Sequence, residues 1–190
     1  VFPCTIAGRD SVGIAIAAKA TINGCDIKAT AATTTAYGVY GLPTSFPLSL
    51  DSIASPEMTI TNTKIDVKTN GTTTAYGVYS GGKSEIKGCT ITVAPKTTTG
   101  YGVYALSHDK TTSIEDTKIT VTTTASASAS AYGIYGSADI DAKSGLCRYG
   151  TFELKGNNNV LAQTTSGNGA YALYLSATKR AITTTGGAYR

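Results

Sequence analysis

The chain has 190 residues, of which 41% are hydrophobic, and a formal net charge of +4. Thr, Ala, Gly and Tyr are abundant, Trp is absent, and apolar residues do not recur at helical spacing, so the composition favours β-structure. The basic residues are scattered rather than clustered among aromatics, which argues against a nucleic-acid partner. No apolar run approaches the ~18 residues that cross a bilayer, so we expect no membrane span.

One tetrapeptide recurs along the chain. A divergent copy, VGIA at 12–15, precedes YGVY at 37–40, 76–79 and 101–104, YGIY at 132–135 and YALY at 171–174. The shortest interval is 25 residues (37 minus 12), and the longer intervals contain insertions of 14, 6 and 14 residues. This pattern predicts a repeat with a base period of 25 residues and insertions at fixed corners.

A second block lies between these copies. It reads TINGCDIKA at 21–29, TITNTKIDV at 59–67, EIKGCTITV at 85–93 and SIEDTKITV at 113–121. Its second half alternates small or apolar residues with polar ones, which predicts a strand with one face in the core and one in water. The fifth period has no clear copy, and the segment from Leu154 to Val160 is the best match.

A unit of this length is too short for a four-stranded propeller blade and fits one coil of a parallel β-solenoid. We therefore predict an all-β fold, a single-stranded parallel β-helix of about six coils. The domain spans 1–190, with clear repeats at 12–174, an inserted loop at 41–55 and an incomplete terminal coil at 175–190. Because the chain begins at Val1 without a leader and stops in TTTGGAYR, we expect a processed product or a fragment.

The TTTAYGVY copies and the TIxxTxIxV blocks resemble the right-handed parallel β-helix family, in particular the passenger regions of adhesins and autotransporter-type surface proteins. The resemblance covers roughly residues 12–174. It implies right-handed coiling and an extracellular or cell-surface location, but the same fold carries lyases, adhesins and structural fibres.

The YGVY strand supplies the predicted binding residues. Since Val39 is always aliphatic in the copies, period-two alternation predicts that Val39 and Tyr37 point inward and that Gly38 and Tyr40 point outward. Phe46 of the inserted loop is a further candidate, because insertions on a rigid solenoid often carry binding, although a loop that caps or pads the side of the solenoid is the simpler interpretation. The outward residues form an external tyrosine ladder: Tyr40, Tyr79, Tyr104, Tyr135 and Tyr174.

The cysteines do not predict a disulfide framework. Cys25 and Cys89 occupy the same position two coils apart, with Thr63 between them. That separation is about 9–10 Å, beyond the ~7 Å Cα limit for a bridge, so we expect two buried thiols. The pairing of Cys4 and Cys147 stays open.

Catalytic motifs are weak. Ser107, His108 and Asp109 are consecutive, whereas the side chains of a hydrolase triad assemble from separate elements. Asp139 and Asp141 share one side of a strand, but no neighbouring coil supplies a second acidic pair in register. We therefore expect no enzyme activity, no metal and no cofactor, and keep a polysaccharide lyase or hydrolase as the alternative.

Two further readings concern polar residues. The in-register Thr33–Thr35, Thr72–Thr74 and Thr97–Thr99 suggest an ice-binding face, but Thr122–Thr124 is displaced, and threonine ladders that stabilise stacked strands are the simpler interpretation. Asn70 begins a glycosylation sequon. The sequence thus predicts an extracellular, non-enzymatic solenoid that binds a glycan or protein surface or self-associates end to end into a fibre or sheath.

Overall fold

A computed structural model describes residues 3–8, 11–41, 56–71, 73–96, 98–107, 110–124, 129–140, 147–148, 150–165, 169–176 and 181–190. All the regular elements in these ranges are β-strands. They accordingly include no helix of a length and apolarity that would cross a membrane.

The strands form three sheets, named here A, B and C. Sheet A contains β1 (Pro3–Gly8), β4 (Asp26–Ala31), β7 (Lys64–Thr69), β10 (Thr90–Pro95), β13 (Lys118–Thr123), β17 (Asn159–Thr164) and β20 (Ala188–Tyr189). Sheet B contains β2 (Ser11–Ile16), β5 (Ala36–Gly41), β8 (Ala75–Ser80), β11 (Gly100–Ser107), β14 (Ser130–Ile140) and β18 (Gly169–Leu175), with β15 (Cys147–Arg148) beside β14. Sheet C contains β3 (Lys19–Asn23), β6 (Glu57–Thr61), β9 (Lys83–Lys87), β12 (Thr111–Glu115), β16 (Thr151–Lys155) and β19 (Ala181–Thr185).

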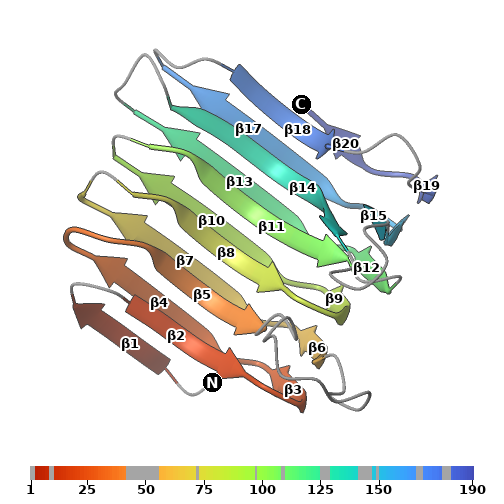
Figure 1. Ribbon diagram of the computed structural model, residues 1–190, viewed down its shortest axis with the longest axis horizontal. Coiled ribbons are helices and arrows are strands. Elements are labelled where there is room, and N and C mark those ends of the chain that lie inside the picture. The colour runs from red at the N-terminus through yellow and green to blue at the C-terminus, as the bar shows by residue number, and fades with distance from the viewer. Residues whose placement is uncertain are drawn as a thin grey trace.

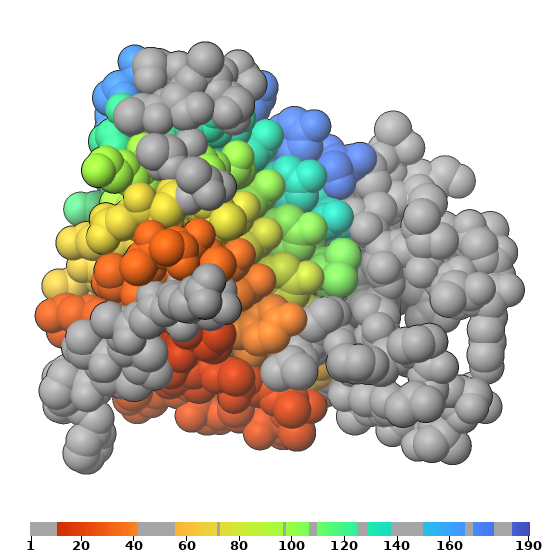
Figure 2. Space-filling view, turned by 60° about the vertical axis from the view of Figure 1, so that its left-hand side comes forward, coloured from red at the N-terminus to blue at the C-terminus, as the bar shows by residue number. Residues whose placement is uncertain are grey.

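The chain visits the sheets in the fixed order A, B, C, so each round of three strands is one coil. Figure 1 shows the strands of successive coils lying side by side, and Figure 2 shows the coils as bands of colour stacked from red to blue. Neighbouring coils pair in parallel, whereas the short β15 pairs with β14 in the antiparallel direction. The predicted parallel β-helix of about six coils is confirmed, while its right-handedness stays a prediction.

Columns of aliphatic side chains fill the interior. The predicted alternation holds in sheet A, where Ile65 and Val67 are completely buried and Asp66 between them is partly exposed. Burying one such side chain contributes about 1.5–3 kcal/mol, so a column repeated in every coil is a large share of the stability. The columns are Ile27, Ile65, Ile91, Ile119 and Val160 in sheet A, and Ile22, Ile60, Ile86, Ile114 and Leu154 in sheet C.

The fifth coil follows the same register. Leu154 pairs with Ile114 and Val160 pairs with Ile119, so the uncertain match between 154 and 160 is confirmed. The segment from Leu154 to Val160 is one residue longer than the segment from Ile114 to Ile119 in the preceding coil. The extra residue lies in the turn that contains Gly156 and Asn158. A corner therefore absorbs an insertion without disturbing the strands on either side.

The turn from sheet C to sheet A repeats one backbone conformation. Its first residue is left-handed in five coils, at Gly24, Asn62, Gly88, Asp116 and Gly156, with φ between 47° and 67°. Gly, Asn and Asp are the residues that tolerate this region best, which explains their choice here.

The next residue of this turn stacks in an inward-facing column. The Thr117 hydroxyl donates to the Glu115 carbonyl at 2.9 Å and accepts from the Cys89 backbone N–H at 3.3 Å. The Asn158 side chain continues the column by accepting from the Thr117 backbone N–H at 3.0 Å. Cys25 and Cys89 occupy the same column as free thiols, as predicted, although Cys25 is only partly buried.

Candidate functional site

The outer face of sheet B carries two adjacent columns of tyrosines, which we call the tyrosine face. Strand pairing places Tyr37 beside Tyr76 and Tyr40 beside Tyr79, and the same register continues coil by coil. The inner column is Tyr37, Tyr76, Tyr101, Tyr132 and Tyr171, and the outer column is Tyr40, Tyr79, Tyr104, Tyr135 and Tyr174. The outer column is the predicted external ladder.

The inner column corrects the prediction that Tyr37 lies in the core. Ala36 and Val39 are completely buried, and Tyr37 is partly exposed with its ring 4.6 Å from that of Tyr40. Gly38 is buried rather than outward, because a Cβ there would meet Val67 of sheet A at 3.0 Å. Two consecutive residues, Gly38 and Val39, therefore face inward, and this break in alternation brings both tyrosines to the outside.

The rings pack in a herringbone. Within a column the ring planes are nearly parallel, as at Tyr76 and Tyr101 (5.0 Å, 8°) and at Tyr104 and Tyr135 (5.1 Å, 7°). Between columns they are steeply inclined, as at Tyr101 and Tyr104 (5.2 Å, 85°). The ring of Tyr40 departs from this order, because it lies at 51° to Tyr79 and at 47° to Tyr37. Both arrangements are favoured by the aromatic quadrupole and contribute about 0.5–1.5 kcal/mol a pair beyond surface burial. The tyrosine face is therefore a fixed array rather than a set of independent side chains.

Three rings of the array have raised pKa values. Burial raises the pKa of Tyr76 and of Tyr101, and the neighbouring phenols raise both values further. Burial likewise raises the pKa of Tyr132. All three residues belong to the inner column. At the C-terminal end of the array the rings are most open, with Tyr171 41% and Tyr174 37% exposed.

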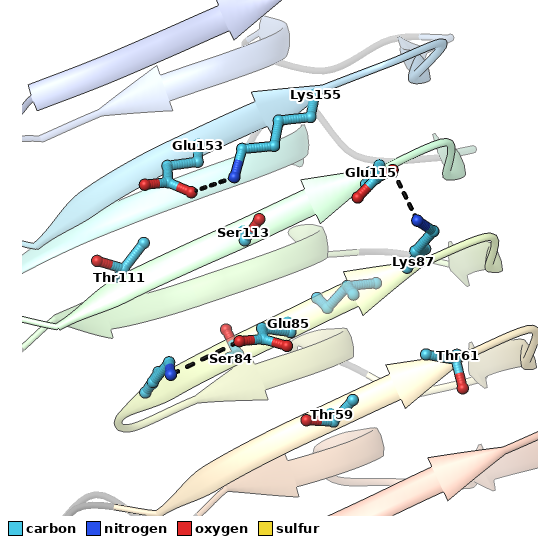
Figure 3. A pocket seen from close by; sticks show the side chains of 12 residues that line it. Thr59, Thr61, Ser84, Glu85, Lys87, Thr111, Ser113, Glu115, Glu153 and Lys155 are labelled. Carbon is cyan, nitrogen blue, oxygen red and sulfur yellow. Dashed lines mark hydrogen bonds and ion pairs between the residues drawn. The ribbon is translucent and has the colours of Figure 1, made fainter.

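The outer face of sheet C is charged, and the sequence analysis did not identify it. A shallow depression of about 470 Å³ crosses β6, β9, β12 and β16 on this face (Figure 3). Period-two alternation of Lys83, Glu85 and Lys87 with the buried Ser84 and Ile86 was a sequence signal for such a face. The lining side chains that the alternation turns outward are Thr59, Thr61, Lys83, Glu85, Lys87, Thr111, Ser113, Glu115, Glu153 and Lys155.

Ion pairs neutralise this depression. Lys87 meets Glu115 of the next coil at 2.7 Å, and Lys155 meets Glu153 of its own strand at 2.6 Å. The hydrogen bond and charge of Glu115 raise the pKa of Lys87, and Glu153 raises the pKa of Lys155 in the same way. Since Lys83 also pairs with Glu85 at 3.6 Å, each of the three lysines has a carboxylate partner. An open, ion-paired depression gives a ligand little unbalanced charge to recognise.

Several candidate residues considered for binding or catalysis lie outside the described residues. These are Phe46, with most of the inserted loop 41–55, as well as His108, Asp109 and Asp141. For Ser107 and Asp139 the structure describes the backbone alone, with Asp139 beside Arg148. Asn70 is exposed in the turn after β7, at a position accessible to a glycan.

The threonine runs lie at the corner between sheets A and B rather than on a flat sheet face. Thr33–Thr35 precede β5, and Thr74 and Thr99 precede β8 and β11. The Thr98 hydroxyl donates to the Thr73 carbonyl of the preceding coil, which joins the two corners. This is the stabilising role expected of stacked threonines.

Comparisons with known protein families, curated proteins and solved structures found no match. The site must therefore be interpreted from its own geometry. Among the described residues no group of three or more His, Cys, Asp or Glu side chains is arranged to hold a metal ion. The tyrosine face is the most regular and the least charged of the surfaces described above.

Proposed function

We propose that this chain is an extracellular, non-enzymatic β-solenoid that serves as an adhesive building block of a cell surface or matrix, with the tyrosine face as its contact surface. The observation that supports this most directly is the array of ten tyrosines at one register in five coils. Tyrosine is enriched at protein interfaces because its ring supplies apolar area at low entropic cost and its hydroxyl hydrogen bonds.

The herringbone determines which part of each ring a partner meets. Parallel neighbours within a column cover ring faces, and perpendicular neighbours between columns cover more of them. A partner on the middle coils therefore contacts ring edges and phenol hydroxyls, which suits the hydroxyl and amide groups of glycans and proteins. For stacking of a sugar on a ring face, the C-terminal end of the array is the most accessible part, because Tyr171 and Tyr174 are exposed there.

Adhesion to immobilised glycans and matrix proteins tests this proposal. The triple variant Tyr79→Phe, Tyr104→Phe, Tyr135→Phe keeps the rings and removes three hydroxyls, each contributing about 0.5–1.5 kcal/mol to a hydrogen-bonded contact. We expect binding to the best surface to weaken about tenfold or more. The matched control, Lys87→Gln on sheet C, should bind as the unmodified chain does. Equal loss in both variants, or no adhesion to any surface, would contradict the proposal.

Self-association into a fibre or sheath is the second part of the proposal. A strand at the edge of a sheet is a template for further pairing, and the sheets of this solenoid present all their coils in one parallel register. Electron microscopy over a concentration series separates the two modes, because lengthening particles favour the fibre and monomers at every concentration exclude it.

The enzyme and ice-binding alternatives stay predictions. The polysaccharide lyase or hydrolase would depend on Asp139 and Asp141, whose side chains lie outside the described residues. If the chain cleaves an acidic polysaccharide and Asp139→Ala abolishes the cleavage, the enzyme alternative would replace the adhesive proposal.

A further inference from the structure

The outer column holds phenols in pairs that recur from coil to coil. The distances between ring centroids and the angles between ring planes are 4.9 Å and 12° for Tyr79 and Tyr104, and 5.1 Å and 7° for Tyr104 and Tyr135. They are 5.2 Å and 13° for Tyr135 and Tyr174. Each pair belongs to adjacent strands of sheet B, which hydrogen bonding holds in register. The partners are thus near neighbours at all times, without a search by diffusion.

Phenols react with one-electron oxidants, and two neighbouring phenoxyl radicals combine through the ring carbons ortho to oxygen. We propose that the tyrosine face is a site of oxidative modification, in which a peroxidase-type oxidant with hydrogen peroxide joins consecutive tyrosines of a column into dityrosine. The product is a series of covalent links across neighbouring coils. This inference does not depend on adhesion, since it concerns the array itself.

The reaction balances for each link. Each of the two phenols loses one electron and its hydroxyl proton, and the two radicals form one carbon–carbon bond. The hydrogen atoms displaced from the two ortho carbons move to the oxygens and restore both aromatic rings and hydroxyls. The two electrons and two protons reduce one hydrogen peroxide to two waters as its O–O bond breaks.

The fold favours coupling within one molecule. Holding two reactants at contact distance replaces a bimolecular encounter with an effectively unimolecular step, with effective molarities that reach about 10⁵ M or more in well-oriented cases. Intermolecular coupling of a dilute protein cannot compete with such proximity. The rings of the inner column stack in the same way, as at Tyr76 and Tyr101 (5.0 Å, 8°) and at Tyr101 and Tyr132 (5.1 Å, 9°), so both columns offer neighbouring phenols for coupling.

The direct experiment treats the dilute native protein with a haem peroxidase and hydrogen peroxide. Dityrosine fluorescence measures the yield, and peptide mapping identifies linked peptides that are two hydrogen atoms lighter than the sum of their parts. We expect a monomeric product whose links join neighbours within a column, such as Tyr79 to Tyr104, Tyr104 to Tyr135 and Tyr135 to Tyr174 in the outer column and Tyr76 to Tyr101 in the inner one. The same treatment in urea should instead give unselective links, many of them between molecules.

Two variants sharpen the result. Tyr104→Phe keeps the ring and removes the oxidisable hydroxyl, so the links to Tyr79 and Tyr135 should disappear while the Tyr135–Tyr174 link persists. Tyr189→Phe is the matched control, since Tyr189 lies in β20 of sheet A and donates its hydroxyl to Gly186 at 3.3 Å. It should leave the pattern unchanged. A native pattern identical to that in urea, or links that are mainly intermolecular, would overturn the proposal without affecting the adhesion test.

Discussion

The tyrosine face of sheet B and the charged face of sheet C use the same register in opposite ways. In sheet B the coils of β5, β8, β11 and β14 present nearly the same residues, so these coils could pack on one another in more than one order. In sheet C the outward residues change from coil to coil, and Lys87 finds Glu115 across one particular boundary. The repeated face supplies stacking energy, and the varied face distinguishes one coil order from another. A solenoid of near-identical repeats needs both, because slippage by a whole coil leaves a uniform face unchanged.

The largest expected loss of stability comes from a substitution in the inward glycine column beneath the tyrosine face. In Gly102→Ala the new Cβ lies 2.5 Å from the Gly133 carbonyl oxygen, so coils must separate locally, and we expect a loss of about 3 kcal/mol in the free energy of unfolding. The sixth coil already has Ala172 at this position, and Ala172→Gly there should cost only about 0.5–1 kcal/mol. Urea denaturation of both variants measures the difference. Equal losses would show that the glycine column is not required by packing.

The next effect measures the energy of the array. Tyr101 contacts four rings, namely Tyr76, Tyr104, Tyr132 and Tyr135, at 5.0–5.2 Å. With about 0.5–1.5 kcal/mol for each pair, Tyr101→Ala should cost about 3 kcal/mol. Tyr101→Phe keeps the ring and should recover most of that loss. If thermal denaturation instead ranks the Phe variant with the Ala variant, the hydroxyl rather than the ring stabilises the face.

Alkaline pH should destabilise the tyrosine face, because tyrosines ionise there. Tyr76 and Tyr101 have folded-state pKa values above the ordinary value, so the folded state holds protons that the unfolded state releases. Their stabilisation is fully present below about pH 10, the ordinary pKa of tyrosine, and is lost as the pH rises above it. The melting temperature should fall steeply above that pH, and less steeply in Tyr76→Phe. A parallel fall in this variant would assign the alkaline transition to other groups.

The smallest effect belongs to the charged face. Lys87→Gln removes an exposed ion pair between coils, and such pairs contribute little because water and salt screen them. We expect a small loss of stability at low ionic strength that vanishes in about 1 M salt, where the Debye length is about 3 Å. Chemical denaturation with urea at both salt concentrations checks it. If Lys87→Gln lost as much stability as Tyr101→Ala, the charged face would stabilise the fold as much as the tyrosine face does.

The sequence predicted the coil period and the sheet A strands, because aliphatic residues at period two leave little choice of face. It failed at Tyr37 and Gly38 for a physical reason. Glycine has no side chain, so its residue type does not indicate which face of the strand it occupies. The break in alternation is a property of the backbone, and counting every second residue along the sequence does not reveal it. The carbonyl of the next coil, which forbids a Cβ at Gly77 and Gly102, appears only once coils are stacked.

The candidate site was therefore half predicted. The outer column was identified from Tyr40 and its equivalents, whereas its inner partners were assigned to the core. The charged face was missed although Lys83, Glu85 and Lys87 alternate with buried neighbours, since the pairing of Lys87 with Glu115 depends on the register between coils. Alternation shows which side chains share a face, and only the stacked coils show which of them meet.

The column of inward glycines in sheet B also limits the space inside the solenoid. At Gly77 a single added carbon would press against Val93 of sheet A at 3.1 Å, and at Gly102 it would lie 3.3 Å from Val121. Sheets A and B thus meet with no bore between them along this column, and even a methyl group lacks space there. At these coils the contact between sheets A and B therefore leaves no passage along the glycine column.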